Sequence, residues 1–232
     1  MTAPVRTQWI PITPGFGGYL ALPPGGNGPG LVLFQEIFGV NEHIRAVAEQ
    51  YALDGFVVLA PDVFWRQAPR VELGYVGDDR VRGMALAQAL KPDEVLADIA
   101  AAVQALRARP EATGRKAGAI GYCMGGRLSY LAAATTDIDA AVPFYGGGIH
   151  TQLERAAAIR CPVQFHYAEH DDHIPPSAVD KVRAALAGKA AEVHVYPGAM
   201  HGFNCWARTS YHAASAALSH GRATAFLAQQ LF

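Results

Sequence analysis

The chain has 232 residues, of which 51% are hydrophobic and 17% charged, with 19 lysines and arginines against 20 aspartates and glutamates. This apolar content excludes a disordered protein, and the length suits one compact unit, so we expect a single domain over residues 1–232. A net charge of −1 without a run of basic residues argues against nucleic acid or an anionic membrane as a partner.

Targeting signals and cysteine usage indicate the compartment. The first residues lack the apolar core of a signal peptide, and no run of 18 apolar residues occurs, so we expect a cytoplasmic protein. Cys123, Cys161 and Cys205 are an odd number of cysteines in a chain long enough to fold without disulfides. Three free thiols in a reducing compartment are therefore expected.

Short apolar runs alternate with longer segments of helical period, which predicts an α/β fold of parallel strands joined by crossover helices. In chain order, the predicted strands cover residues 7–12, 19–21, 30–34, 56–60, 117–122, 140–145, 163–167 and 192–196. The predicted helices cover residues 42–53, 81–90, 93–107, 124–134, 176–186 and 209–230. Residues 61–80 contain two prolines and no firm period, so we expect an excursion over the edge of the sheet that suits a lid.

The run from Gly121 to Gly126 places Gly-x-Cys-x-Gly between an apolar strand and a helix. This is the arrangement of a nucleophile elbow, with cysteine in the place of serine. Glycines two residues before and after Cys123 avoid a collision where strand and helix approach, and the helix N-terminus favours a thiolate. A small buried cysteine between packing glycines is the alternative interpretation, so the partners of Cys123 must decide.

A hydrolase with such an elbow needs an acid and then a histidine later in the chain. Asp171 and Asp172 follow the predicted strand 163–167, and His201 follows the last predicted strand. Because α/β sites assemble at the carboxyl ends of strands, we expect these side chains to converge on Cys123. We choose Asp171 as the partner of His201, because the next helix starts a few residues after it and Asp172 can help to cap that helix. Asp172 stays an alternative.

Four motifs together resemble the dienelactone hydrolase family: the elbow, the segment Gln35–Gly39, Asp171-x-x-Ile-Pro and His201-Gly-Phe. The resemblance extends from about Pro14 to the C-terminus. It implies an α/β-hydrolase fold, with a mostly parallel central sheet and helices on both faces. It also implies hydrolysis of a carboxylated enol lactone of the dienelactone type, through a Cys-His-Asp triad and a thioester acyl-enzyme. We expect a monomer that needs no cofactor and whose partner is a small lactone or activated ester.

The resemblance assigns further roles around the triad of Cys123, Asp171 and His201. Glu36 would contact the nucleophilic thiol and control its ionisation, and it lies too far before the next helix to cap it. The backbone N–H groups of Ile37 and Met124 would form the oxyanion hole. The further candidates for contact with the substrate are Phe38 and Tyr145.

A substrate carboxylate calls for an arginine at the mouth of the pocket. Arg80 and Arg82 lie near one arginine position of the family, and the residues alone leave the choice open. A second family arginine follows the catalytic histidine by four residues, where this chain has Cys205. Arg208 could replace it through a longer reach. An arginine bound only to solvent is the alternative for all three, so the exact substrate stays open.

Other interpretations of the sequence compete with a lactonase. His166, His170 and His173 suggest a zinc or manganese site, but His166 and His170 would lie ~13 Å apart on an extended strand, so we expect no metal. A broader carboxylesterase or lactonase acting on another activated ester is the first alternative function. A redox sensor or binding protein that uses the Cys123 thiol ranks below it. We expect Cys161 to be a buried thiol and Cys205 to serve packing rather than the pocket.

Overall fold

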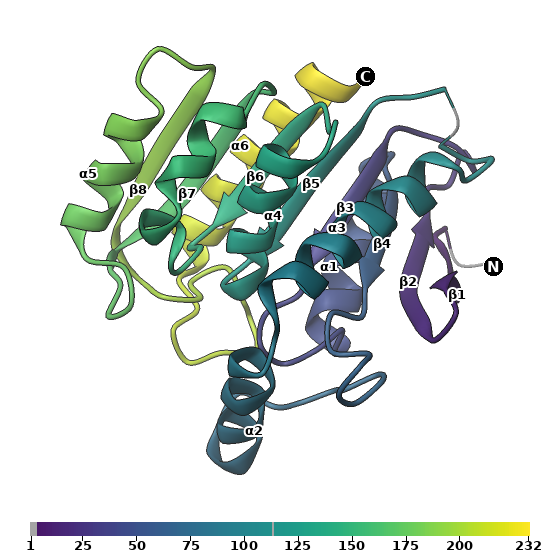
Figure 1. Ribbon diagram of the computed structural model, residues 1–232, viewed down its shortest axis with the longest axis horizontal. Helices are drawn as coiled ribbons and strands as arrows, with labels where there is room; N and C mark the ends of the chain where they lie inside the picture. The colour runs from purple at the N-terminus through teal and green to yellow at the C-terminus, as the bar shows by residue number, and fades with distance from the viewer. Residues whose placement is uncertain (1–3, 113) are drawn as a thin grey trace.

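The computed structural model describes residues 4–112 and 114–232, which build a layered α/β structure (Figure 1). The strands are β1 (Arg6–Thr13), β2 (Phe16–Leu22), β3 (Gly30–Phe34), β4 (Val57–Pro61), β5 (Ala117–Tyr122), β6 (Ala140–Phe144), β7 (Val163–His170) and β8 (Ala191–Met200). The helices are α1 (Glu42–Leu53), α2 (Gly77–Gln88), α3 (Pro92–Arg107), α4 (Met124–Thr135), α5 (Pro176–Ala185) and α6 (Ala213–Leu231). Two short 3-10 helices, η1 (Ile149–Thr151) and η2 (Leu153–Ala158), follow β6.

The strands form one sheet in the order β1-β2-β4-β3-β5-β6-β7-β8. β2 pairs antiparallel with β1 and β4, and all other neighbours run parallel, which confirms the predicted mostly parallel sheet. From β3 the chain continues to β4 on one side and later to β5 on the other. The carboxyl ends of β3 and β5 therefore mark the point where the winding reverses, which is where α/β sheets place their sites.

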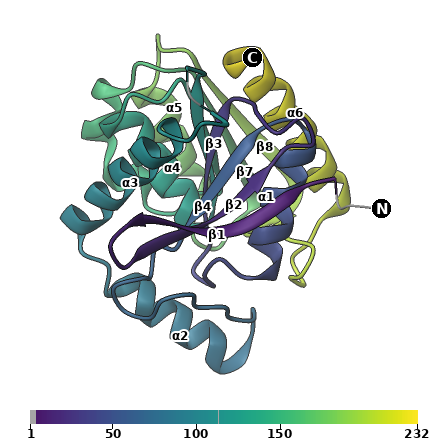
Figure 2. The same cartoon turned by 90° about the vertical axis from the view of Figure 1, so that its right-hand side faces the viewer.

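Helices cover both faces of the sheet, with α3, α4 and α5 on one side and α1 and α6 on the other (Figure 1, Figure 2). Every residue of the central strands β3, β5 and β6 is buried, which explains why these strands are continuous apolar runs. The predicted stripe of α3 is also present, because Val95, Ile99, Val103 and Leu106 are all buried.

Several strands are longer than predicted: β2 begins at Phe16 rather than at residue 19, β7 continues to His170 and β8 continues to Met200. The extensions of β7 and β8 bear on the site. They remain paired in parallel through Ala168 with Tyr196 and, after an irregularity, through His170 with Met200. The added residues are largely exposed, so they lack the apolar signal that marks the inner part of each strand. As a result, the residues that follow the two strands are held next to each other at the edge of the sheet.

Two predicted helix starts were wrong. Helix α2 begins at Gly77 rather than at residue 81, because Asp78 and Asp79 stabilise its first turn and Asp79 also accepts a hydrogen bond from the Gly74 N–H. Helix α6 begins at Ala213 rather than at residue 209, since residues 209–212 form a turn before the helix. Both corrections concern helix ends, where polar contacts decide the boundary.

The predicted excursion over residues 61–80 is anchored to the body for most of its length. The apolar residues that hold it are Val63, Phe64, Val71 and Leu73, and all four are buried. Only α2 projects from the body, and in two views it lies below the sheet (Figure 1, Figure 2). A moving lid would therefore have to involve α2 rather than the whole segment.

The helices were compared in length and hydropathy with what a membrane span needs. Across residues 4–112 and 114–232, no helix combines the length and the apolar character that crossing a bilayer requires. The first three residues of the N-terminal segment, for which the sequence predicts no signal peptide, lie outside the described residues.

Candidate active site

Cys123 occupies the turn between β5 and α4 in a strained conformation, with φ 56° and ψ −117°. The neighbouring glycines are required by close backbone contacts. A Cβ atom on Gly121 would lie 2.1 Å from the Gly125 carbonyl oxygen, and one on Gly125 would lie 2.1 Å from the Phe34 carbonyl oxygen. The Cys123 N–H donates to the carbonyl oxygen of Phe144 at 3.1 Å, which fixes the turn to the adjacent strand. This is the geometry of a nucleophile elbow.

β7 and β8 bring an acid and a base together at the same edge. The His201 Nδ1 lies 2.8 Å from Asp171 Oδ2. Asp171 Oδ1 accepts hydrogen bonds from the backbone N–H groups of His173 and Ile174 at 2.9 and 3.1 Å. Asp171 is buried whereas Asp172 is exposed. The geometry therefore favours Asp171, the residue preferred from the sequence, as the partner of His201.

The second ring nitrogen of His201 lies on the side of the thiol. Nε2 is buried and has no hydrogen-bond partner within the geometric limits among the described residues. Cys123 is nevertheless close enough to interact electrostatically with the ring. Burial alone would lower the pKa of His201, but the interactions with Cys123 and Asp171 raise the pKa to about 10. The ring is therefore an imidazolium at neutral pH, placed between a carboxylate and the sulfur. Such a cation stabilises a thiolate.

Glu36 lies directly after β3, where it is buried and paired with Arg208. Its Oε1 accepts a hydrogen bond from Arg208 Nη1 at 3.0 Å. Burial raises the pKa of Glu36, while the charges of Arg208 and His201 oppose that rise. The other oxygen, Oε2, is buried and has no partner among the described residues. Asn41 caps α1 by accepting from the Ile44 N–H, so Glu36 does not serve that helix.

Arg208 extends into the site from the turns after β8. It lies three residues further along the chain than the family arginine position, as the sequence suggested. Its guanidinium lies 5.8 Å from the ring centre of Phe38 and 5.9 Å from that of Tyr75. It passes close to Gly202, where a Cβ atom would lie 2.4 Å from Nη1. Phe38 is 2% exposed, and the Arg208 guanidinium lies over its ring. Arg208 is occupied by Glu36 rather than free for an incoming anion.

The other predicted site residues also lie near the elbow. The Tyr145 ring meets the His201 ring edge-on at 5.1 Å, and its buried hydroxyl has no partner within the described chain. Met124 is the first residue of α4, so its N–H has no acceptor within the helix. The N–H of Ile37 likewise has no acceptor among residues 4–112 and 114–232. Free backbone donors of this kind are what an oxyanion hole requires.

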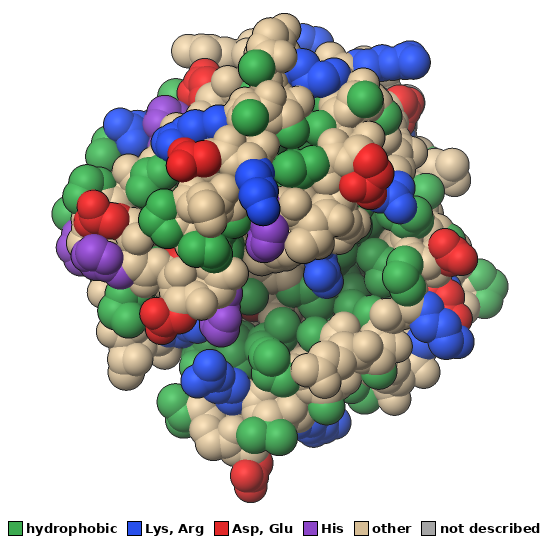
Figure 3. Space-filling model, turned by 60° about the vertical axis from the view of Figure 1, so that its left-hand side comes forward, with side chains coloured by type: hydrophobic (Ala, Val, Ile, Leu, Met, Phe, Trp, Pro, Cys, Tyr) green, Lys and Arg blue, Asp and Glu red, His purple; other side chains and the backbone are tan. Residues whose placement is uncertain are grey.

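Arg80 and Arg82 are both exposed on α2. This helix packs against the site, because a Cβ atom on Gly83 would lie 2.5 Å from the carbonyl oxygen of Ile37. Figure 3 shows a hollow lined by hydrophobic side chains between the lobe at the bottom, where α2 lies, and the rest of the molecule. Both arginines therefore lie on the helix that borders the site, and the choice between them stays open.

His43 was missed by the sequence reasoning. It is 3% exposed, and burial together with the charge of Arg208 lowers its pKa to about 4, so the ring is neutral at pH 7. Cys205 is completely buried, and burial raises the pKa of its thiol to about 12. A signal for His43 existed, because it precedes Val47 by four residues on the buried face of α1, where apolar residues are usual.

The remaining cysteine and histidine candidates have other surroundings. Cys161 is only partly buried, and burial raises the pKa of its thiol to about 11. His166 is buried in β7, where Nδ1 contacts the Tyr196 hydroxyl at 2.7 Å and Nε2 contacts Gln164 Oε1 at 2.9 Å. His166 thus uses both nitrogens within the sheet.

Comparison with known proteins places the chain among related sequences and folds. Residues 16–231 match the Dienelactone hydrolase family. A carboxymethylenebutenolidase of Pseudomonas putida is 34% identical over 216 residues, which cover 92% of this chain and 91% of that protein. Carboxymethylenebutenolidase 1 of Cupriavidus pinatubonensis is 33% identical over 184 residues, which cover 78% of each chain.

Solved structures agree in architecture. A Klebsiella pneumoniae protein assigned to the dienelactone hydrolases superimposes with a TM-score of 0.86 and 31% identity, covering 98% of this chain and 100% of its own. A dienelactone hydrolase-like promiscuous phosphotriesterase from metagenomic libraries gives a TM-score of 0.82 at 23% identity, with 98% of each chain covered. The second likeness supports the fold alone.

Proposed function

The chain belongs to the dienelactone hydrolase family and has the α/β-hydrolase fold, so it is a hydrolase of esters or lactones, and we propose that it opens an enol lactone of the dienelactone type through a thioester on Cys123. The observation that carries this proposal is the convergence of three loops. Asp171 holds His201 at 2.8 Å, and Cys123 faces the other side of that ring from a strained elbow.

In the first step, the Cys123 sulfur is the nucleophile. Asp171 binds His201 Nδ1 and so fixes the orientation and the tautomer of the ring. The imidazolium and the N-terminus of α4 stabilise the thiolate, and Glu36 Oε2 is a second acceptor for the thiol proton. A second proton acceptor suits a nucleophile whose proton must leave as the substrate arrives.

The thiolate then attacks the carbonyl carbon of the lactone and forms a carbon–sulfur bond. The electron pair of the carbonyl double bond moves to oxygen, where the N–H groups of Ile37 and Met124 donate to the oxyanion. Collapse of the tetrahedral intermediate breaks the ring carbon–oxygen bond, and the ring oxygen leaves as an enolate that takes the proton from the His201 imidazolium, which leaves the ring neutral. Water, deprotonated by His201, hydrolyses the thioester and returns the thiol.

The leaving group explains the choice of cysteine. A thiolate is itself a good leaving group, so the intermediate goes forward only when the departing oxygen leaves at least as readily. An enolate meets this condition far better than an alkoxide does. We therefore expect slow turnover of simple alkyl esters and amides at Cys123.

A carboxylated substrate needs a cation that is not already neutralised. Because Arg208 is paired with Glu36, this role passes to Arg80 or Arg82 on α2. The test is the KM for a carboxylated enol lactone and for its methyl ester in Arg80→Ala and Arg82→Ala. Arg160→Ala is the matched control, because Arg160 is exposed and precedes β7, so it lies at the amino ends of the strands, away from the site at their carboxyl ends. We expect a rise in KM for the carboxylated lactone in one α2 variant, and no change in either would remove the arginine clamp.

The nucleophile is tested by Cys123→Ala, with Cys161→Ala as the control. We expect lactone hydrolysis to fall at least ~10³-fold in Cys123→Ala and to persist in Cys161→Ala. Intact-mass spectrometry of the wild-type enzyme during turnover should show an acyl adduct on the peptide that contains Cys123. Near wild-type activity in Cys123→Ala would contradict the mechanism. Activity on alkyl esters as fast as on enol lactones would favour a broader carboxylesterase.

A further inference from the structure

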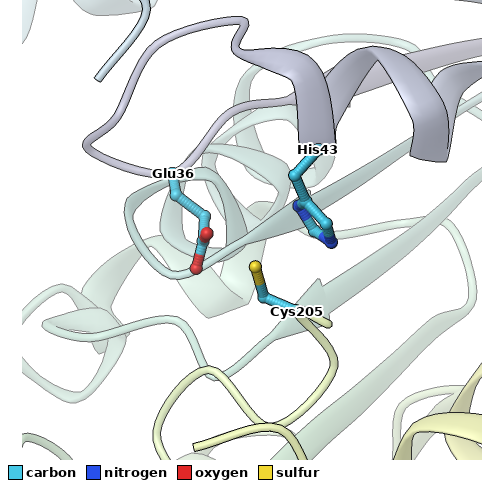
Figure 4. Close-up of side chains that lie close together, drawn as sticks. All are labelled: Glu36, His43 and Cys205. Carbon is cyan, nitrogen blue, oxygen red and sulfur yellow. The ribbon is translucent and has the colours of Figure 1, made fainter. Parts of the chain in front are cut away.

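Glu36, His43 and Cys205 form a buried cluster behind the thiol site, which the hydrolytic mechanism does not fully use. Their ligand atoms all lie within 4.8 Å of one another. Figure 4 shows the three side chains pointing toward one another from separate segments: the turn after β3, the first turn of α1 and the turns after β8. All three residues are buried.

The hydrogen bonds of this cluster are incomplete. Both nitrogens of His43 and the Oε2 of Glu36 are buried without a partner among the described residues. A neutral imidazole and a carboxylate oxygen of this kind normally bind a protein group, an ordered water or an ion. Three orphaned polar atoms that face one sulfur therefore point to a guest at the centre of the cluster.

We propose that Glu36, His43 and Cys205 form a binding site for Zn²⁺. Carboxylate oxygen, imidazole nitrogen and thiolate sulfur are all zinc ligands, and the sulfur–nitrogen pair selects against Mg²⁺ and Ca²⁺. Ligand atoms around a tetrahedral zinc lie about 3.5 Å apart. Side-chain rotations that move the ligand atoms by about 1 Å would therefore bring them to zinc-binding distances. Three protein ligands leave the fourth position to water.

The surroundings of Cys205 supply a second layer of support. The side-chain amide of Asn41 donates to the Tyr75 hydroxyl at 3.0 Å, and that hydroxyl and the Ala207 N–H hydrogen-bond to the sulfur. Donors of this kind orient a thiolate and stabilise it when it binds a metal. On binding, the sulfur–hydrogen bond is replaced by a sulfur–zinc bond, and the proton passes to solvent. Glu36 can keep Arg208 on Oε1 while Oε2 binds zinc.

A groove adjoins the cluster on the side of His43. A groove of about 460 Å³ lies outside His43, between Tyr75 and Trp206, and the carboxylates of Glu42 and Glu72 line it. The Trp206 ring packs edge-on against the His43 ring at 4.2 Å. Glu72 is paired with Arg45, so Glu42 is the carboxylate at the mouth that attracts a cation, and Trp206 would have to move for the ion to enter.

Zinc at this site would inhibit hydrolysis, and this consequence rests on the proposed function. Once Oε2 of Glu36 is a metal ligand, it can no longer accept the proton of Cys123. Occupancy and catalysis therefore exclude each other at this one oxygen atom.

Binding is tested in the Cys123→Ser variant, which removes the nucleophilic thiol as a competing ligand and stands apart from the catalytic proposal. We expect one Zn²⁺ per chain by dialysis, and with Co²⁺ a sulfur-to-cobalt charge-transfer band together with the visible absorption of a tetrahedral ion. A further Cys205→Ser or His43→Gln change should weaken binding at least ~100-fold, and Tyr75→Phe about 10-fold. Cys161→Ser is the matched control and should leave binding unchanged. Absence of stoichiometric metal, or affinity that survives loss of both Cys205 and His43, would overturn the site and leave only a bridging water.

The inhibitory consequence has its own readout in the wild-type thiol background. Zn²⁺ should slow lactone hydrolysis by the wild-type enzyme, and a chelator should restore the rate. The Cys205→Ser variant should hydrolyse the lactone at the same rate with and without Zn²⁺. Circular dichroism verifies that each variant is folded. Inhibition of equal strength in Cys205→Ser would place the zinc on Cys123 and overturn the inhibitory role.

Discussion

Two buried ion pairs near the active site differ in how completely their hydrogen bonds are satisfied. Asp171 uses Oδ2 for His201 at 2.8 Å and Oδ1 for two backbone N–H groups. Glu36 uses Oε1 for Arg208 at 3.0 Å and leaves Oε2 without a partner among the described residues. The side chains of both carboxylates are shielded from bulk solvent.

This difference separates an orienting acid from a reactive one. A carboxylate whose oxygens are all engaged holds its partner in one geometry and has little capacity for a new proton or ion. A carboxylate with a free buried oxygen can take up either. Asp171 therefore acts on His201 alone, whereas Glu36 can respond to the thiol proton or to a metal ion.

The largest effect is expected for Asp171→Asn. The amide keeps an oxygen for the backbone N–H groups but presents an N–H to His201, which reverses the tautomer of the ring. We expect kcat for lactone hydrolysis to fall about 10⁴-fold while the fold is retained. The exposed neighbour gives the matched variant, Asp172→Asn, which should keep wild-type kcat. Equal losses in the two variants would show that Asp171 has no special link to His201.

Arg208→Met tests the second pair through stability. It leaves Glu36 buried and unpaired, so the free energy of unfolding should fall by about 3–5 kcal/mol. The comparison is Arg45→Met, because Arg45 pairs with exposed Glu72 at 2.6 Å. A surface pair of this kind should contribute about 0–1 kcal/mol. Urea denaturation measures both, and similar losses would mean that burial does not distinguish the two pairs.

Glu36→Gln tests whether the free oxygen takes part in turnover. Loss of a proton acceptor while His201 remains should lower kcat/KM about 10²-fold. The rate of thiol alkylation against pH should change as well, which a purely structural role would not cause. Glu154→Gln, at an exposed position on η2, serves as the control. An alkylation profile identical to that of the wild type would assign Glu36 to support of Arg208 only.

Most of the fold could be predicted from the sequence, because apolar periodicity is its main determinant. The central strands β3 and β5 and the helix α1 have their predicted bounds. The failures lie where polar groups decide the structure, as in the exposed ends of β7 and β8 and the first turn of α2. Such ends depend on pairing and capping contacts that no periodic pattern encodes.

The site divides along a similar line. Cys123, Asp171 and His201 have local signals in the elbow and in their positions after strands, so they could be named before the structure. The contacts of Arg208 and His43 could not, because Arg208 meets a residue 172 positions away and His43 lies in an ordinary helix. Long-range side-chain pairs of this kind depend on how the turns after β8 fold back over α1.

The smallest predicted effect concerns the pH dependence of stability and separates the two pairs once more. The pKa of His201 is raised to about 10 in the folded protein, above the ordinary value of 6.5. A raised pKa means that the folded state binds the proton more tightly. The stabilisation is therefore complete below about pH 6.5 and is lost as the pH rises through 10. Because Cys123 is partly exposed and solvent screens its interaction with the ring, we expect a loss of about 2 kcal/mol.

The measurement is the difference in unfolding free energy between wild type and His201→Gln at pH 6.5, 8 and 10. That difference should shrink as the pH rises. The Glu36–Arg208 pair should respond differently, because an arginine stays charged over this range and the charge of Arg208 opposes the rise in the pKa of Glu36 that burial causes. Arg208→Met should therefore not become less destabilising as the pH rises from 6.5 to 10. If the destabilisation by Arg208→Met also declined with rising pH, the stability of both pairs would depend on the same titrating group. The distinction between Asp171 as an orienting acid and Glu36 as a reactive one would then be wrong.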